Sequence, residues 1–242
     1  MRALRGIIRA GIVLALLFVA GVVGWGYFRH HPQDVPWGQL DLAEKPGLFS
    51  GRRLAALTGD FDQCRALLTR AGVDYAVMPA RKGEHCGYSD RVRIRPGGAS
   101  PIRFRPAGLG TSCPVAAALV MWEWNGLQPA AQRYFGTKVV AIRHLGSYSC
   151  RRMYGRGSGA WSEHATADAV DVAGFVLADG REVSVLRDWK GDGENAAFLH
   201  AVRDDACDLF ATVLSPDYNN AHRDHFHLDQ AERGALGGRA CR

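Results

Sequence analysis

The sequence lacks internal repeats, low-complexity tracts and C-x-x-C pairs of cysteines. The first two absences exclude a repeat architecture and argue against disorder, and the third argues against a zinc ribbon or a dithiol redox motif. What is present is a chain of 242 residues, 47% of them hydrophobic, which is long enough to bury a core in one large or two small domains.

Basic residues outnumber acidic ones, and the formal net charge is +6. This excess favours anionic partners through Coulomb attraction, although an ordinary basic surface is the simpler interpretation. The arginines are scattered rather than interleaved with aromatic residues, and no phosphate-binding loop is recognisable. A metal nuclease is therefore a weaker hypothesis, and no nucleic-acid partner is expected.

One long apolar run is present, and it lies at the N-terminus. Residues 10–28 carry no charge, and arginines lie on both sides of them. About 18 to 20 apolar residues suffice to cross a bilayer as a helix, and the three preceding arginines favour a cytoplasmic N-terminus. A cleavable signal has a shorter apolar stretch and an A-x-A-like site. We therefore expect residues 1–31 to be an uncleaved inner-membrane anchor, with Trp25 and Tyr27 at the outer interface and the rest of the chain exported.

Residues 32–47 contain three prolines and little periodicity, so they are expected to form a linker, with the folded part beginning near Leu48. Beyond it the pattern predicts, in order, a short amphipathic helix, two short strands joined by a turn, a core helix, a strand, a hairpin and a second amphipathic helix. These elements fall within residues 60–73, 85–108, 112–136, 137–150, 169–186 and 195–214. The order is that of an α+β fold with a small antiparallel sheet flanked by helices.

The six cysteines are an even number, which fits disulfides in an exported domain. Spacing alone does not select among the many pairings that six cysteines allow. Local closure is the least demanding arrangement, and it predicts sequential pairs: Cys64 with Cys86, Cys113 with Cys150, and Cys207 with Cys241.

Two clusters carry residues that suit metal chemistry. His164 ends a glycine-rich loop, and Asp171 lies seven positions later among Ala and Val of a predicted strand. A buried, unpaired carboxylate is costly, and a bound cation would offset that cost. Near the C-terminus, His225 and His227 share one side of an extended segment. Catalytic Zn²⁺ sites use three protein ligands and keep one position open, so the two clusters together favour a zinc site carried by the sheet.

These residues resemble a known group of zinc peptidases. "SEHATADAVD" is similar to the S-x-H-x-x-G-x-A-x-D motif, and "HFH" to the distal H-x-H motif, of D-alanyl-D-alanine carboxypeptidases and dipeptidases, penicillin-insensitive murein endopeptidases, lysostaphin-type enzymes and the hedgehog signalling domain. Ser162, His164, Ala169 and Asp171 match position by position. Ala167 stands where glycine is usual, a departure that leaves the ligands in place.

Over a longer span, from Cys64 to Cys241, the chain resembles the bacterial extensin-like C-terminal domain family, whose members are treated as relatives of the murein peptidases. This resemblance divides the exported part into residues 48–110, the N-terminal part of the extensin-like domain, and residues 111–242, a zinc peptidase-like core. The proline-rich repeats of plant cell-wall glycoproteins are absent.

The resemblance also implies a role for each site residue. The zinc ligands would be His164, Asp171 and His227, with His225 as the catalytic histidine and His222 assisting it or binding substrate. "GSYSCRRMYG" is similar to a segment whose arginine stabilises the developing oxyanion. Arg151 is its nearest match, and Arg152 is the alternative.

The resulting hypothesis is a periplasmic, Zn²⁺-dependent peptidase whose partners are peptidoglycan peptides and the inner membrane. Carboxypeptidase and endopeptidase action, on D,D or L,D linkages, both fit it. The alternative is an inactive zinc-containing module that binds the cell wall or regulates. A serine hydrolase is disfavoured because Ser162 has no convincing base.

Neighbouring acidic residues have weaker assignments. Asp224 and Asp229 are candidates for orienting an imidazole N–H, and each equally fits a solvated loop acid. Glu163 is expected to point away from the zinc. The other histidines are expected to be structural or exposed: His30, His31, His85, His144 and His200.

Overall fold

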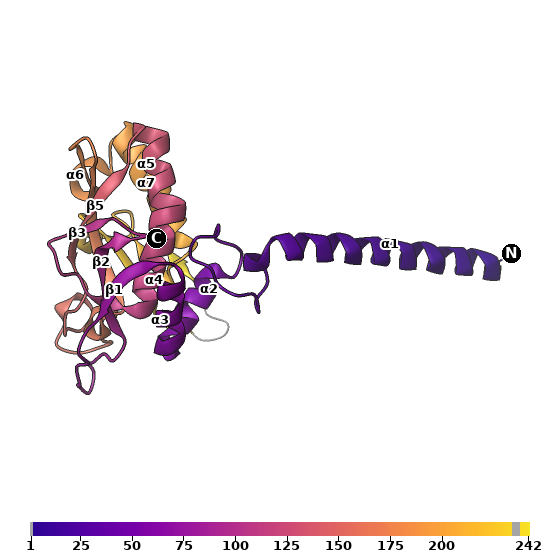
Figure 1. Cartoon of the computed structure of the whole chain (residues 1–242), viewed down its shortest axis with the longest axis horizontal. Coiled ribbons are helices and arrows are strands. Elements are labelled where there is room, and N and C mark those ends of the chain that lie inside the picture. The colour runs from indigo at the N-terminus through magenta and orange to yellow at the C-terminus, as the bar shows by residue number, and fades with distance from the viewer. Residues whose placement is uncertain (1, 234–237) are drawn as a thin grey trace.

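A long N-terminal helix, α1 (Arg2–His30), projects from an α+β domain in the computed structural model, which describes residues 2–233 and 238–242 (Figure 1). No residue of α1 is buried, and the helix is long and apolar enough to cross a membrane. The domain end of α1 contacts η1 (Pro32–Asp34), and the N-terminus is the part farthest from the domain.

The folded domain contains helices of several kinds and two sheets. The helical elements after α1 are η1 (Pro32–Asp34), α2 (Ser50–Ala55), η2 (Ala56–Gly59), α3 (Phe61–Arg70), α4 (Cys113–Trp122), η3 (Glu123–Leu127), α5 (Gln128–Phe135), η4 (Met153–Gly155), η5 (Glu163–Thr166), α6 (Val185–Asp188), α7 (Glu194–Cys207) and η6 (Asn220–His222). The strands are β1 (Val73–Val77), β2 (Arg91–Gly98), β3 (Arg103–Arg105), β4 (Thr111–Ser112), β5 (Val139–Gly146), β6 (Ala169–Leu177), β7 (Glu182–Ser184), β8 (Thr212–Leu214), β9 (Phe226–Asp229) and β10 (Ala240–Cys241).

The larger sheet has the strand order β10-β8-β9-β6-β5-β3, and β7 also pairs with β6. Its central pairs are antiparallel, while the outer pairs β3 with β5 and β10 with β8 are parallel. The smaller sheet, β1-β2-β4, is antiparallel. Strand β6 lies in the middle because it is apolar and buried along almost its whole length.

Helix α4 forms the centre of the core, as its nearly uniform apolar sequence predicts. All ten of its residues are buried, and the Trp122 indole donates a hydrogen bond to the Val202 carbonyl of α7 at 2.9 Å. The Ser112 hydroxyl caps its first turn by accepting from the Val115 amide, and Pro114 occupies that turn without losing a needed donor. The predicted core helix is confirmed, with a π-helical turn (η3) before α5.

The other predicted elements are found with one difference in their arrangement. The helix after Asp60, the strand β5, the hairpin β6–β7 and helix α7 are all present. Residues 85–108 contain two strands, as predicted, but these belong to different sheets: β2 to the smaller and β3 to the larger.

Two of the three predicted disulfides are wrong. The structure pairs Cys64 with Cys113, Cys86 with Cys150, and Cys207 with Cys241, so only the last pair is confirmed. Closeness in sequence did not decide the pairing because distant elements meet in the fold: α3 packs on α4, and the loop after β1 lies on the segment after β5, where the Tyr148 hydroxyl donates to the Cys86 carbonyl at 3.1 Å.

Residues 32–47 also differ from expectation, because they pack on the domain instead of forming an extended linker. Leu42 is fully buried in the core, and its carbonyl accepts a hydrogen bond from the Asn125 side chain at 3.2 Å. Gln33 is buried and is held by the Arg53 guanidinium through its backbone and side-chain oxygens, both at 2.9 Å. The packed structure therefore begins well before Leu48.

Candidate metal centre

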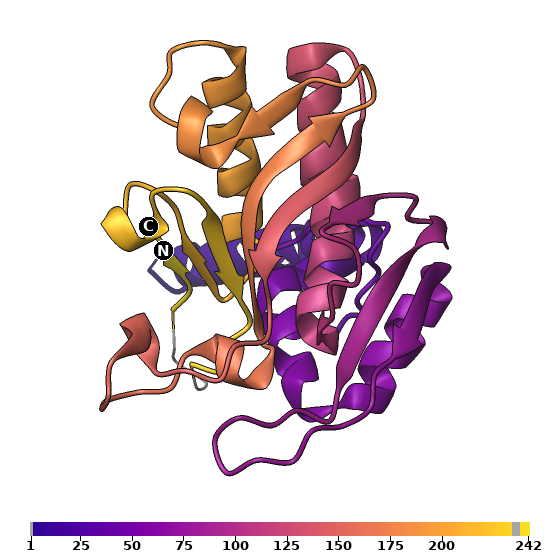
Figure 2. The ribbon, with the colours of Figure 1, turned by 90° about the vertical axis from the view of Figure 1, so that its left-hand side faces the viewer.

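Pairing of β6 with β9 brings Asp171 and His227 together from positions 56 residues apart in the chain. The two residues are directly opposite in the antiparallel register, where Cβ atoms lie about 4.5–5.5 Å apart. Their apolar neighbours on both strands alternate to the other face and enter the core. The two strands lie side by side, β6 in orange and β9 in yellow (Figure 2).

His164 completes the cluster from η5, the short 3₁₀ helix that leads into β6. Its Nε2 lies 3.2 Å from Asp171 Oδ1 and 3.1 Å from His227 Nδ1, and the last two atoms are 3.1 Å apart. All three residues are buried. The three residues expected to be zinc ligands thus form a nearly equilateral triangle of ligand atoms.

The outer nitrogens of both rings face groups that only accept hydrogen bonds. His164 Nδ1 donates to the Ser147 carbonyl at 2.5 Å, and His227 Nε2 donates to the Asp229 carboxylate at 3.0 Å. With these protons outside, a neutral ring turns its remaining lone pair towards the centre of the triangle. This arrangement, in which an outer partner sets the tautomer and orientation of each imidazole, is typical of metal-ligating histidines.

The electrostatics of the triangle favour a positive charge inside it. Burial alone would raise the pKa of Asp171, but the adjacent imidazoles of His164 and His227, which can take up a proton between them and the carboxylate, outweigh it, and the pKa lies well below its ordinary value. Burial alone would lower the pKa of His227, but Asp171 and Asp229 outweigh it and raise this pKa to about 9. The cluster therefore attracts a proton or a metal cation.

The donor set fits Zn²⁺. Tetrahedral zinc with bonds of about 2.0 Å separates its ligands by about 3.3 Å, close to the 3.1–3.2 Å edges of the triangle. Two imidazoles and one carboxylate form a common catalytic zinc set, which leaves a position open for water or substrate.

His225 and His222 lie beside the triangle. His225 Nδ1 donates to Asp224 at 2.9 Å, and its Nε2 is 3.5 Å from Asp171 Oδ1. His222 Nδ1 donates to the Asn219 side-chain oxygen at 2.8 Å, and its ring centroid is 5.3 Å from that of His225. Burial, together with the neighbouring His225 and His227, lowers the pKa of His222 to about 4, so His222 is neutral at pH 7.

A cleft of about 860 Å³ opens over the triangle and distinguishes the two arginine candidates. Arg151 lines this cleft together with the histidines. Arg152 instead donates to the Gly159 carbonyl, and its guanidinium lies 4.5 Å from the centre of the Trp161 ring. The structure therefore brings Arg151 to the cluster and engages Arg152 elsewhere.

Some functional contacts were missed by sequence reasoning or assigned the wrong direction. Glu163 lines the cleft rather than pointing away from it, and burial, with the charge of Asp229, raises its pKa. By contrast, Asp224 and Asp229 were both candidates for orienting an imidazole N–H, and they accept hydrogen bonds from His225 Nδ1 at 2.9 Å and His227 Nε2 at 3.0 Å. The Ser147 contact uses a backbone carbonyl, for which no side-chain signal exists.

The alanine in the usual glycine position adopts a left-handed backbone. Ala167 ends η5 with φ 62°, and its carbonyl accepts from the Ser112 amide at 2.8 Å. A left-handed backbone costs an L residue about 1–2 kcal/mol. This explains why glycine suits the position and shows that alanine still permits the turn that presents His164.

Replacing Ala167 by glycine is expected to leave the free energy of unfolding nearly unchanged. Relief of about 1–2 kcal/mol of backbone strain is offset by about 0.4–1 kcal/mol of added unfolded-state freedom and about 0.8 kcal/mol for the buried methyl group. Ala167→Val should destabilise by about 2 kcal/mol or more. Thermal unfolding compares both with Ala178→Val at an exposed turn position, and equal losses at the two valine positions would contradict the strain assignment.

A second buried carboxyl lies beneath the site. Asp168 accepts a hydrogen bond from the Ser112 hydroxyl at 2.5 Å. Burial raises its pKa well above the ordinary value; the Ser112 bond opposes this, and the charges of Glu163 and Asp229 add to it. The folded state therefore retains a proton that the unfolded chain releases near pH 4.

This proton predicts a pH dependence of stability. Its stabilising contribution is complete below about pH 4 and is lost as the pH rises through the folded-state pKa. Asp168→Asn keeps an acceptor for Ser112 but does not ionise. The melting temperature of the variant should therefore rise relative to the parent between pH 4 and pH 8, and parallel curves would contradict the assignment.

Fold and site together define an α+β domain with three disulfides and a buried histidine–aspartate cluster at the floor of a cleft. The sequence model described as extensin-like protein C-terminus matches residues 62–242 of the chain. The chain belongs to this extensin-like C-terminal family. No curated protein and no solved structure matches it.

Proposed function

We propose that the chain is a zinc-dependent peptidase that cleaves peptidoglycan peptides in the periplasm. The observation that carries this proposal is the convergence of His164 Nε2, Asp171 Oδ1 and His227 Nδ1 within 3.1–3.2 Å at the floor of a cleft.

The three ligands would hold Zn²⁺, which supplies Lewis-acid chemistry that polarises a peptide carbonyl and acidifies water. The Ser147 carbonyl and the Asp229 carboxylate keep the two imidazole ligands in orientation. These contacts preserve the geometry of the donor set through the reaction.

His225 is the proton-transfer residue of this mechanism. Its Nδ1 is fixed by Asp224, so Nε2 carries the exchangeable lone pair beside Asp171. From there it takes a proton from the water that attacks the scissile carbonyl, and it returns this proton to the amine that leaves when the C–N bond breaks. Arg151, which lines the same cleft, complements the negative charge that develops on the carbonyl oxygen. His222 is a neutral hydrogen-bonding partner for substrate or for His225.

The same proposal includes the location of the protein. Helix α1 would span the inner membrane once, with its arginine-rich end in the cytoplasm and the domain in the periplasm. The three disulfides support an oxidising compartment.

One observation favours a second candidate, a zinc-containing module without turnover. The ligand side chains are only 4%, 13% and 11% exposed, as in a structural metal site. The cleft above them, with His225 and Arg151 on its walls, favours the enzyme.

Purified muropeptides distinguish the two candidates. The full chain, reconstituted in nanodiscs, should release cleaved peptides in the presence of zinc, lose this activity in a chelator and regain it when zinc is added back. Mass spectrometry of the products identifies the bond cut. One equivalent of bound zinc without any product would favour the binding module and reject the peptidase.

A further inference from the structure

Two exposed apolar side chains stand out on the domain. Among the described residues outside α1, the most exposed large hydrophobic side chains are Trp37 at 84% and Leu48 at 74%, and the next highest value is 58%. Both lie in the segment of residues 35–49, which follows α1 and η1. Exposure of this kind in one short segment is typical of a surface that contacts an apolar phase or a partner.

Hydrogen bonds hold this segment at the end of α1. The Tyr27 hydroxyl, in the last turns of α1, donates to Asp34 Oδ2 at 2.7 Å, and the Leu48 amide donates to Asp34 Oδ1 at 2.9 Å. Gly47 allows this approach, because a Cβ atom there would lie 2.5 Å from the same carboxylate. Leu48 is thus two hydrogen bonds away from the outer end of the apolar helix.

The segment is also fixed to the domain. Arg53 of α2 donates to the Gly38 carbonyl and to both oxygens of Gln33. Leu42, which lies between Trp37 and Leu48 in the sequence, is buried in the core. These contacts and those of Asp34 set the position of the segment relative to α1, and Figure 1 shows α1 joining the domain through this segment.

We infer that residues 35–49 rest in the interfacial layer of the membrane that α1 spans, with Trp37 and Leu48 inserted among the lipids. The inference relies on the proposal that α1 is a membrane anchor. Tryptophan favours the boundary between headgroups and acyl chains, and Trp25 and Tyr27 lie at the same end of α1. Trp37 and Leu48 thus extend the interfacial contact that Trp25 and Tyr27 make at this end of α1.

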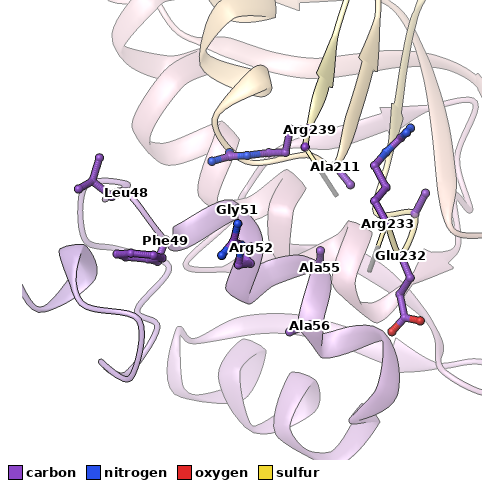
Figure 3. A pocket seen from close by; sticks show the side chains of 12 residues that line it. Leu48, Phe49, Gly51, Arg52, Ala55, Ala56, Ala211, Glu232, Arg233 and Arg239 are labelled. Atoms are coloured by element: carbon purple, nitrogen blue, oxygen red, sulfur yellow. The ribbon is translucent and has the colours of Figure 1, made fainter. Parts of the chain in front are cut away.

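The surroundings of Leu48 fit a lipid surface. Figure 3 shows Leu48 at the outer edge of a cavity of about 450 Å³, away from Glu232 and Arg233. Arg52 lines the same cavity, is exposed, and forms no ion pair with any residue that the structure describes. Its guanidinium suits a lipid phosphate.

Quenching by brominated lipids tests this contact in the full chain. The chain is placed in nanodiscs of phosphatidylethanolamine and phosphatidylglycerol, with and without bromine on the acyl chains. A Trp25→Phe variant removes the tryptophan of the span, and its emission should still fall in brominated lipid. A Trp25→Phe/Trp37→Phe variant should lose this fall. Equal quenching of the two variants would overturn the inference.

The parent chain separates failure of the anchor from failure of the contact. Bromine should quench Trp25 in the parent if α1 is inserted. An unquenched parent would reject the anchor and the contact together, whereas a quenched parent with an unquenched Trp25→Phe variant would reject the contact alone.

Leu48 is tested in the Trp25→Phe background. Leu48→Ser should reduce the quenching of Trp37, and Leu186→Ser, at a 58% exposed position on α6 and away from α1, should not. Equal quenching in these two variants would remove Leu48 from the membrane contact.

Discussion

Asp171→Asn is expected to lower the zinc affinity of the chain by at least about 100-fold, because replacing residues one contact further from a metal already costs about 10–100-fold. The carboxylate supplies the charge of the triangle, and its Oδ1 lies within 3.2 Å of both imidazole nitrogens. Asparagine has almost the same shape but carries no charge. Titration calorimetry with zinc on the full chain measures the loss without any assay of turnover.

Asp224→Asn is the matched control for this substitution. Asp224 contacts His225 and contributes no atom to the triangle, so its change to asparagine should leave the zinc affinity within a few-fold of the parent. If the two variants bound zinc equally well, the assignment of Asp171 as a ligand would be wrong.

His225→Ala is expected to reduce turnover of muropeptides by about 10²- to 10⁴-fold, the usual contribution of a positioned proton-transfer group. The bound zinc should remain at one equivalent, since the ligand atoms come from His164, Asp171 and His227. Product release is followed by chromatography, and zinc content by elemental analysis of the same preparation.

Asp224→Asn again provides the comparison. It keeps His225 but weakens the contact that orients its ring, so turnover should fall less than in His225→Ala and the pH profile should shift. Full activity in His225→Ala would show that another group transfers the proton, and loss of zinc from that variant would make His225 a ligand.

Local periodicity made much of the fold and the candidate site predictable. The alternation through His225 and His227 puts two imidazoles on one face, and the apolar run around Asp171 marks a buried strand. Their meeting across β6 and β9 is a long-range pairing, which the need of a zinc site for three ligands and the resemblance to zinc peptidases anticipated. The core helix α4 was readable because its whole surface is apolar.

What could not be predicted depends on contacts between distant segments. The Cys64–Cys113 bond follows from the packing of α3 on α4, and nothing in the spacing of cysteines encodes it. Arg151 and Arg152 are adjacent in sequence, but only Arg151 lines the cleft. Arg152 contacts the Trp161 ring instead, and this contact depends on the turn that brings Trp161 beside it. Residues 32–47 have the composition of a linker, yet two buried side chains, Gln33 and Leu42, fix them to the domain.

The packing of residues 32–47 on the domain determines how far the cleft can lie from the end of α1. Fully extended, these 16 residues would span about 50 Å and let the domain sweep a wide volume around its point of attachment. Held against the core by Arg53 and Leu42, they add almost nothing to that distance. With α1 in a bilayer, the cleft stays at one height, and a target must come within one domain diameter of the lipid surface.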